Sequence, residues 1–349
     1  MKIIVTGGAG HVGVNTCLEA KAKGHEVACF DNFVRPLTEE NITVLESNGI
    51  LIVRGDVRNP EDFDKFPWIP DGIVHLAGQC GIPYSIVNPL YDFDVNVKGV
   101  INILEYSRTH GKIPVVFAST NKVYTDMLNE VRFEEKETRY ELNEAQFDYK
   151  DHISKDGIKE TFPLDAFGKY SRSPYGTSKV AADLYCQEYW RAFQVPTIVF
   201  RMSCIYGFYQ KGVEDQGWVD HFLRTIAFGN GKITIFGDGK QVRDMLFGTD
   251  VAQAYIAALE QHKEVAGEVF NIGGGKDFTW SLLEAIHYIE ELTGKKATIE
   301  YQDWRHADQR IVYMDLAKVK EKLGWQPTVR PQEGVKLMFE VYKSMGGSK

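Results

Sequence analysis

The sequence predicts a doubly wound α/β fold with a parallel sheet, followed by a smaller α+β portion. Three observations lead to this prediction: segments typical of strands alternate with segments typical of helices, a run of glycines follows the first strand, and an acidic residue ends the second strand. Strands that alternate with helices imply a parallel sheet covered by helices on both faces. The 349 residues suffice for one large or two modest domains.

The first predicted strand, Ile3–Val5, breaks into the glycine-rich segment Gly7–Gly13, and a helix and a second strand ending on Asp31 follow. This order is typical of a Rossmann-type dinucleotide site. The glycines let the backbone approach a pyrophosphate at the positive end of the helix, and the acid accepts from the ribose hydroxyls. A carboxylate repels a 2′-phosphate, so NAD is favoured over NADP, although Arg35 lies nearby in the sequence. A glycine loop without a ligand is the alternative.

The alternation of strands and helices continues as far as a strand that ends on Ser119. Asp56 and Val57 follow the third predicted strand, where they can contact an adenine, and Leu76–Gln79 end the fourth. Small residues in this last segment let the backbone approach a cofactor; tight packing against a helix is the alternative. Ligands bind beyond the carboxyl ends of parallel strands, so these segments open onto one crevice. The three strands are predicted at residues 49–53, 72–76 and 114–118, and a long helix at residues 88–110.

Residues 125–172 are polar and rich in charge, and they show no clear period. We expect them to form an ordered but irregular excursion over the crevice, with disorder as the alternative. Aromatic residues favour order because they supply packing groups. These aromatic residues are Phe133, Tyr140, Phe147, Phe162 and Phe167.

A Tyr-x-x-x-Lys pair, Tyr175 and Lys179, stands at the start of the next predicted helix. Residues four apart share a helix face, so the phenol and the ammonium point into the same space. Free tyrosine, with a pKa of about 10, is a poor base at neutral pH, and a fixed cation beside it favours the phenolate. Tyr175 is therefore the candidate general base, and Thr120 or Ser119 is the candidate donor to the reacting oxygen. A chance pair on a surface helix is the alternative.

The last third of the chain mixes strands and helices, and we expect it to form a smaller α+β cap over the crevice. Strands are predicted at residues 196–200, 232–236 and 268–272, and helices at residues 249–261 and 281–292. The domains are expected to be residues 1–204 with about 245–275 for the dinucleotide, and residues 205–244 with 276–349 for the substrate.

Composition narrows the classes of function. The net charge of −8 argues against a general binder of nucleic acid or of anionic membranes, but a phosphorylated small molecule needs only a local basic clamp. The sequence has no apolar run of about 20 residues, and it enters a strand at once, which leaves no room for a signal peptide. Five scattered cysteines without CxxC spacing fit buried thiols in a reducing cytoplasm and no metal site.

The glycine loop, Asp31, the segment Ser119–Tyr124 and the Tyr175/Lys179 pair together resemble those of the extended short-chain dehydrogenases/reductases, the family of nucleotide-sugar epimerases and dehydratases. The resemblance extends to Leu323–Pro327. It implies that Tyr175 takes a substrate proton, that Lys179 lowers the pKa of that tyrosine and holds the nicotinamide ribose, and that Thr120 is the catalytic Ser/Thr. The residues expected at NAD are Gly7, Gly10, His11, Val12, Gly13, Asp31, Asn32, Asp56, Val57, Leu76, Ala77, Gly78, Gln79, Asn96, Ser119, Tyr175 and Lys179.

The two residues after Thr120 bear on the reaction. The family's dehydratases carry an Asp-Glu pair there, whereas this sequence has Asn121 and Lys122, so dehydration loses its acid and base. Segments 119–124, 215–219, 239–244 and 308–310 are instead similar to those of the CDP-paratose 2-epimerases, also called CDP-tyvelose epimerases. The residues expected at a CDP-linked sugar are Asn121, Lys122, Gln216, Trp218, Arg243 and Arg310.

Several alternatives stay open. Arg243 and Arg310 are expected to grip the substrate pyrophosphate, because arginine forks suit phosphate oxygens, but an ion pair with Asp or Glu is the alternative for each. Gln216 and Trp218 can equally pack at a helix start. The enzyme can instead be a 4-epimerase of a nucleotide hexose, a reductase with exchangeable NADPH, or a non-catalytic NAD-binding member. The resemblance also implies a homodimer or homotetramer formed through residues 88–110 and 175–191.

Overall fold

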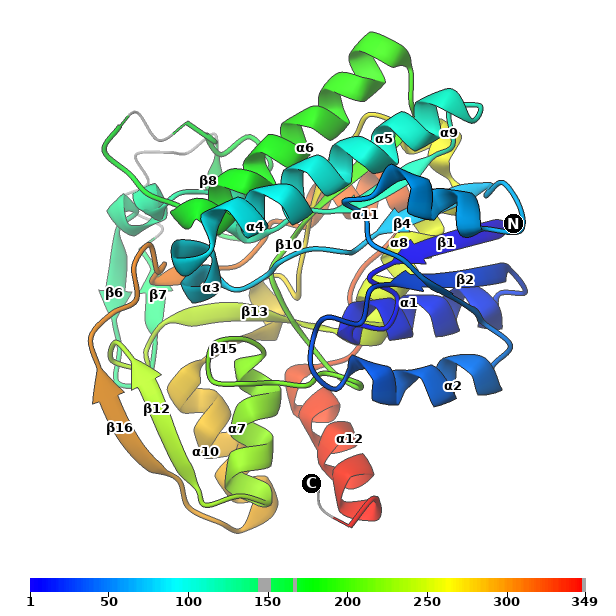
Figure 1. Cartoon of the computed structure of the whole chain (residues 1–349). Helices are drawn as coiled ribbons and strands as arrows, with labels where there is room; N and C mark the ends of the chain where they lie inside the picture. Colours follow the sequence, from blue (N-terminus) through cyan, green and yellow to red (C-terminus); the bar gives the residue numbers. More distant parts are fainter. Residues whose placement is uncertain (144–151, 166–167, 347–349) are drawn as a thin grey trace.

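Seven parallel strands form the central sheet of the computed structural model, in the spatial order β14-β10-β5-β4-β1-β2-β3 (Figure 1). The chain runs outward from β1 through β2 to β3, then crosses to β4 on the other side of β1. The carboxyl ends of β1 and β4 therefore flank the point where the strand order reverses, which is where this class of sheet binds ligands. The strands are β1 (Lys2–Thr6), β2 (Glu26–Asp31), β3 (Leu51–Arg54), β4 (Gly72–His75), β5 (Val115–Ala118), β10 (Thr197–Met202) and β14 (Val269–Ile272).

Side chains of the central strands alternate between two hydrophobic clusters, as the period of two of a strand requires. Ile3 and Val5 belong to the cluster that contains α1 (His11–Ala22) and α8 (Gly248–Glu260) residues, whereas Ile4 belongs to the opposite one. Helices α5 (Gly99–Thr109) and α6 (Ser173–Phe193) cover this second face (Figure 1). The predicted doubly wound parallel sheet is confirmed.

The helix predicted at residues 88–110 is built differently. It consists of α4 (Pro89–Phe93), one π-helical turn at Asp94–Lys98, and α5, in direct succession. A π-turn holds one residue more than an α-turn and often marks a functional site. Here it carries Asn96, whose side chain faces the end of β4.

A second, smaller group of strands and helices surrounds its own hydrophobic cluster, which includes Phe222, Ile286 and Met338. Strand β13 (Val242–Phe247) is its centre and pairs with β11 (Cys204–Tyr206), β15 (Thr279–Ser281) and β17 (Ile311–Val312), while β12 (Lys232–Phe236) pairs with β16 (Thr298–Gln302). Its helices are α7 (Trp218–Ala227), α10 (Leu282–Thr293) and α12 (Pro331–Ser344). The division of the chain into two domains at the stated residues stays a prediction.

The structure describes residues 1–143, 152–165 and 168–346. Within these ranges the excursion forms two short hairpins, β6 (Phe133–Glu135) with β7 (Tyr140–Leu142) and β8 (Ile153–Ser154) with β9 (Gly157–Ile158). Phe162 and Tyr140 are buried, and Phe147 and Phe167 lie outside the described residues. The remaining helices are α2 (Ile42–Ser47), α3 (Ile82–Val87), α9 (His262–Val265) and α11 (Ala317–Leu323).

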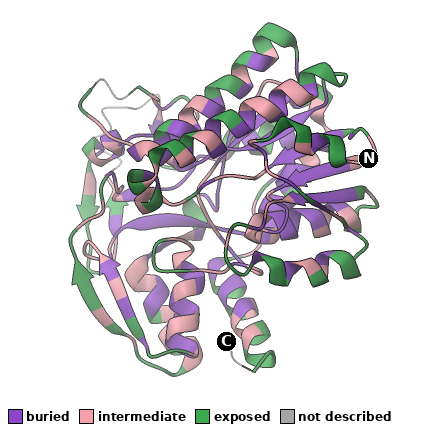
Figure 2. Cartoon of the chain, in the orientation of Figure 1, coloured by how far each residue is buried: buried purple, intermediate pink, exposed green. Residues whose placement is uncertain are grey.

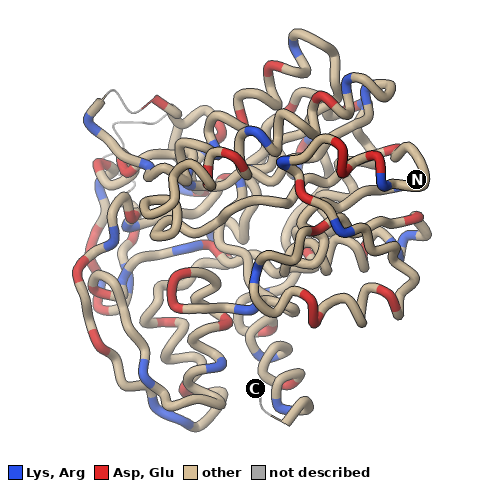
Figure 3. Tube along the Cα trace, in the orientation of Figure 1, with Lys and Arg blue, Asp and Glu red and all other residues tan. Residues whose placement is uncertain are grey.

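Burial follows these layers, since the strands of the central sheet other than the edge strand β3 are mostly buried and the outer faces of the helices are exposed (Figure 2). Acidic and basic side chains are distributed over both portions of the molecule (Figure 3). Among the residues that the structure describes, no helix is both long and apolar enough to cross a bilayer.

Candidate active site

The glycine loop between β1 and α1 fits a pyrophosphate. Gly7 has a φ of +65°, and a Cβ on Gly13 would lie 2.2 Å from the carbonyl oxygen of Gly7. A Cβ on Gly10 would meet that oxygen at 3.3 Å, a tight contact that a small shift relieves, so the fold depends on glycine there much less than at Gly13. Gly10 is the N-cap of α1, and as a glycine it has no side chain that could accept from the N–H groups of the first turn. The first turn of the helix therefore keeps its N–H groups and its positive end for an anion.

His11 and Val12 begin α1 behind this loop. Burial lowers the pKa of His11 to about 3, so its imidazole is neutral, and its buried Nε2 has no hydrogen-bond partner among the described residues. An unpartnered polar atom at the helix start is consistent with a ligand there. Val12 packs partly buried against the α1 side of the core.

The acidic residues after β2 and β3 are held by their surroundings. Oδ2 of Asp31 accepts from the N–H of Ala9 at 3.0 Å and Oδ1 accepts from the N–H of Phe33 at 2.8 Å, and burial raises the pKa of this carboxyl. Burial opposes ionisation of Asp56, but hydrogen bonds from Arg58 and then Asn32 lower its pKa to about 2. Val57 is buried in the core beneath.

The segment Leu76–Gln79 is fixed from both sides. The N–H groups of Leu76 and Ala77 donate to the hydroxyl of Thr6, at 3.2 and 3.3 Å. Asn96 accepts from the N–H of Gln79 at 2.9 Å and donates to its carbonyl at 3.0 Å. A Cβ on Gly78 would meet Oδ1 of Asn96 at 3.1 Å. Both ends of the Asn96 amide are thus used inside the protein, where they shape the turn expected to face the cofactor.

The structure brings the three expected catalytic side chains together. Tyr175 and Lys179 lie buried on α6, and the hydroxyl of Thr120, which follows β5, lies close enough to the phenol to act on its pKa. Nζ of Lys179 donates to the carbonyl of Ala118 at 2.6 Å and lies 4.2 Å from the centre of the Phe117 ring. The arrangement can move a proton between a substrate hydroxyl and Tyr175.

The pKa of Tyr175 differs from the expectation. Burial raises it, and the nearby hydroxyl of Thr120 acts in the opposite direction but more weakly. Burial also lowers the pKa of Lys179 to about 8. The ammonium is held by Ala118, so the lysine by itself does not produce the depressed tyrosine pKa that its spacing suggests.

Ser119 and Thr120, the two candidates for the donor to the reacting oxygen, have different surroundings. The hydroxyl of Ser119 is fully buried and donates to Oδ2 of Asp183 at 2.8 Å. The hydroxyl of Thr120 accepts from the N–H of Lys122 at 3.2 Å, donates to Oδ1 of Asn121 over a longer distance of 3.3 Å, and is the one that lies near Tyr175. This geometry favours Thr120 as the donor.

Two of the three charged residues expected at the substrate, Arg243 and Lys122, pair with a neighbouring acid. Oδ1 of Asp308 accepts from Nη2 of Arg243 at 2.9 Å and from Nζ of Lys122 at 3.4 Å. The ion-pair alternative for Arg243 is thus present in the structure. Asn121 is buried beside Thr120, and its Oδ1 accepts from the threonine hydroxyl at 3.3 Å. Asp308 was not among the expected residues, because nothing in its local sequence marks its partners.

Arg310, Gln216 and Trp218 lie further out. The guanidinium of Arg310 stacks 3.4 Å from the centre of the Trp304 ring. Gln216 exchanges two backbone hydrogen bonds with Val213, and Trp218 begins α7 with its ring 5.4 Å from that of Phe222. Trp218 packs against the second core, as its packing alternative describes, and contact of these residues with substrate stays a prediction.

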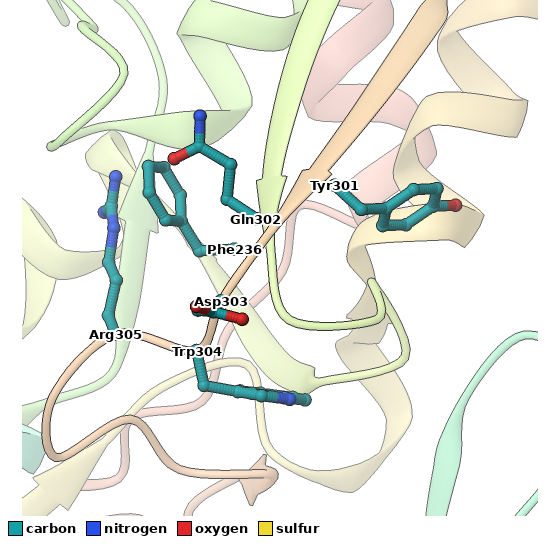
Figure 4. Close-up of a pocket in the computed structure, with 6 residues that line it drawn as sticks. All are labelled: Phe236, Tyr301, Gln302, Asp303, Trp304 and Arg305. Atoms are coloured by element: carbon teal, nitrogen blue, oxygen red, sulfur yellow. The ribbon is translucent and has the colours of Figure 1, made fainter.

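A pocket of about 600 Å³, which the sequence did not predict, lies at the ends of β12 and β16 (Figure 4). Arg305 stacks 3.9 Å from the centre of the Phe236 ring and pairs with Asp215 at 2.8 Å. Trp304 lies across the pocket, whereas Tyr301 points away from the other side chains (Figure 4). The N–H of Asp308 donates to the carbonyl of Arg305 at 3.2 Å, so the pocket adjoins the cluster of Arg243, Lys122 and Asp308. Its lining residues are Phe236, Tyr301, Gln302, Asp303, Trp304 and Arg305.

Known proteins resemble this chain along its length. The NAD dependent epimerase/dehydratase family matches residues 3–273. CDP-paratose 2-epimerase of Salmonella typhi is 36% identical over 348 residues, which cover 97% of this chain and 98% of that one. UDP-glucose 4-epimerases of Thermotoga maritima, solved with UDP-glucose, and of Thermus thermophilus, solved with NAD, share the fold with TM-scores of 0.79 and 0.78, each at 27% identity over at least 98% of both chains. The chain belongs to the NAD-dependent epimerase/dehydratase family, and the predicted cofactor, NAD, is confirmed.

Proposed function

We propose that this chain, an NAD-dependent nucleotide-sugar epimerase, inverts carbon 2 of a CDP-linked 3,6-dideoxyhexose and converts CDP-paratose to CDP-tyvelose. The observation that carries the proposal is the site around Tyr175: the phenol meets Thr120, and the next two residues, Asn121 and Lys122, bear no carboxyl group. Such a site supports oxidation and reduction at a carbon that bears a hydroxyl, and it lacks the acid and base for eliminating water. The identity to the Salmonella typhi enzyme supports the choice of sugar and base.

Oxidation at carbon 2 itself is the simplest route. Inversion by deprotonation would need an adjacent carbonyl, and a ketone at carbon 4 would acidify carbons 3 and 5 but not carbon 2. Tyr175 takes the proton of the 2-hydroxyl, and Thr120 holds the same oxygen. When bound, NAD supplies the acceptor for the hydride and returns it to the other face of the sugar. The site must therefore keep its cofactor through the cycle.

Tyr175 must lose its proton to act as a base, although burial raises its pKa. A positive charge in the same space offsets this effect. Lys179 supplies part of that charge from four residues along α6, and the oxidised nicotinamide ring supplies the rest. The base is thus competent only with its cofactor in place.

We assign the nucleotide part of the substrate to the cluster of Arg243, Lys122 and Asp308 and to the pocket at the ends of β12 and β16 beside it. Arg243 and Lys122 offer donors to the diphosphate if Asp308 gives up its place between them. Arg310 stays assigned to the diphosphate as well, and the pocket between Phe236 and Trp304 has aromatic walls suited to a base. Held at this end, the flat 2-keto sugar can turn over within the site.

The route of the hydrogen tests the proposal. CDP-paratose that carries deuterium at carbon 2 is incubated with the enzyme in ordinary water, and the label is followed into the product. Label retained at carbon 2 is the expected result, and label lost to solvent would mean a deprotonation route. Absence of epimerisation, together with turnover of UDP-glucose, would point to the 4-epimerase alternative, which the Thermotoga maritima structure favours.

We also propose a homo-oligomer in which a second copy of this chain covers an apolar face of α3, α4 and α6. Large apolar side chains on these neighbouring helices are unusually exposed, and Leu90, the most exposed, is 80% accessible. Contiguous apolar surface of this kind marks an interface. Light scattering should give a dimer or tetramer that Leu90→Glu dissociates, whereas a monomeric wild type would refute the proposal. The exposed residues are Tyr84, Ile86, Val87, Leu90, Phe93, Leu184 and Tyr185.

A further inference from the structure

A buried ion pair lies behind the catalytic residues, and the proposed chemistry does not use it. Asp183 and Arg201 are 0% and 3% exposed, and Nε of Arg201 lies 2.9 Å from Oδ2 of Asp183. Asp183 stands four residues after Lys179 and eight after Tyr175, so all three share one face of α6. Removing two charges from water is costly, and a buried pair is weak evidence for added stability. Its fixed geometry is the feature that needs an explanation.

The ion pair is joined to the strand that carries Thr120. Oδ2 of Asp183 also accepts from the hydroxyl of Ser119, at 2.8 Å, and Ser119 directly precedes Thr120. One carboxylate oxygen thus holds the end of β5 and the side chain of Arg201 on β10. Tyr175 and Thr120, which must meet at one substrate oxygen, come from the two elements that this carboxylate connects.

The excursion supplies a further hydrogen-bond partner to Arg201, the carbonyl of Glu160. Nη1 of Arg201 donates to the carbonyl of Glu160 at 3.0 Å and to the hydroxyl of Tyr124 at 3.2 Å. That hydroxyl donates to Oδ1 of Asn271 at 2.7 Å, and the N–H of Asn271 donates to Oε1 of Glu160 at 2.8 Å. The Arg201 guanidinium therefore keeps all of these hydrogen bonds only when the segment around Glu160 lies against it.

We infer that Asp183 and Arg201 are positioning residues that hold Thr120 on β5 against Tyr175 on α6, with the excursion as the third support of the pair. The inference rests on the proposed roles of Thr120 and Tyr175. It also explains how the excursion contributes to the site, because the backbone of Glu160 fixes the guanidinium that in turn fixes the carboxylate. A displacement of about 1 Å at a reacting pair can cost about 100-fold in rate, so a device of this kind acts on turnover more than on binding.

Ser119→Ala tests the link, because it removes the hydroxyl that ties the end of β5 to Asp183 and leaves the ion pair in place. We expect kcat to fall about 10- to 100-fold, with KM and bound NAD little changed and a larger isotope effect from deuterium at carbon 2. Gln187→Ala is the matched control: it removes another hydrogen bond to Asp183, of 2.7 Å, without touching β5, and should change kcat less than about twofold. Equal losses in the two variants would overturn the inference.

A second measurement needs no substrate, so it separates this inference from the proposed reaction. The protein is labelled with ¹³Cζ-tyrosine, and the Tyr175 resonance is assigned with Tyr175→Phe. Ser119→Ala should shift this resonance because Thr120 moves away from the phenol, whereas Gln187→Ala should not. No shift in Ser119→Ala would refute the positioning role, whether or not the wild type acts on CDP-paratose.

Discussion

The cofactor side and the substrate side of the crevice are prepared for their ligands in different ways. On the cofactor side, backbone groups and buried amides already hold the shape: two N–H groups fix Asp31, and Asn96 grips both backbone groups of Gln79. On the substrate side, charged groups hold one another, as Asp308 does with Arg243 and Lys122. We therefore expect NAD to meet a formed site, whereas a diphosphate must replace an existing carboxylate.

The largest effect is expected where the two sides meet. Tyr175→Phe removes the proton acceptor but keeps the ring, so turnover should fall by about 10²- to 10⁴-fold while NAD binding changes little. Steady-state kinetics and titration of the cofactor-free protein with NAD measure the two quantities. Near-normal turnover in the variant would remove Tyr175 from the mechanism.

Substitutions of two loop glycines, Gly13 and Gly10, test whether the cofactor site is formed before NAD binds. Gly13→Ala places a Cβ 2.2 Å from the carbonyl of Gly7, so we expect unfolding free energy to fall by about 1–3 kcal/mol. Gly10→Ala places a Cβ 3.3 Å from the same carbonyl oxygen, a tight contact that a small shift relieves, so its Tm should fall much less than that of Gly13→Ala. NAD binding should weaken, because the added methyl group meets the pyrophosphate. Calorimetry and NAD titration of both variants decide; equal loss of stability would show that Gly10 is also a folding requirement.

Cofactor choice is the next test of the cofactor side. We expect NAD to bind more tightly than NADP, because the Asp31 carboxylate would face the 2′-phosphate with like charge in a partly buried groove. Asp31→Ser should reduce the ratio of NAD affinity to NADP affinity about tenfold, because the substitution removes one repulsion between like charges. Equal or tighter binding of NADP by the wild type would contradict the assignment.

On the substrate side, Arg243→Met should weaken binding of CDP and raise KM about 10- to 100-fold, the effect of one charge-assisted hydrogen bond, with NAD binding unchanged. Arg108→Met is the charge-matched control, since Arg108 is partly exposed and pairs with Glu105 on α5. Isothermal titration with CDP and with NAD separates the two sides. An equal loss for both ligands would show that the sides are coupled.

The smallest expected effect is a difference in the pH dependence of stability. The lowered pKa of Asp56, about 2, means that its ionisation stabilises the fold above pH 4 and that this contribution is lost as the pH falls toward 2. Burial raises the pKa of Asp244, which follows Arg243 in the chain, to about 6. The free energy of unfolding therefore decreases as the pH rises from about 4 to 6, because this carboxyl group ionises in the unfolded chain before it ionises in the folded one. Denaturant unfolding should show that Asp56→Asn reduces the loss of stability below pH 4, whereas Asp244→Asn reduces the loss of stability between pH 4 and 6. The same change of pH dependence in both variants would contradict the opposite pKa shifts of the two residues.

Local patterns account for the parts of the molecule that the sequence could predict. Apolar strands ending in glycine or in Asp31 identify the sheet and its ligand edge, and a spacing of four places Tyr175 and Lys179 on one helix face. The π-helical turn around Asn96 escaped prediction, because one extra residue in a turn leaves no mark on a helical pattern. Asp308 escaped too: its partner Lys122 stands 186 residues away, and only the folded chain brings them together.

The pairing of Asp308 with Arg243 also bears on how fast a nucleotide sugar arrives. Asp308 offsets only one of the two positive charges that share it, those of Arg243 and Lys122, so the cluster projects a weak positive field, and the chain as a whole carries a net charge of −8. A negatively charged diphosphate is therefore not drawn in from a distance, and its association rate should lie below the diffusional ceiling of about 10⁸–10⁹ M⁻¹s⁻¹ for a substrate. Added salt should leave that rate unchanged or raise it, because the net negative charge of the chain repels the incoming substrate and salt screens this repulsion.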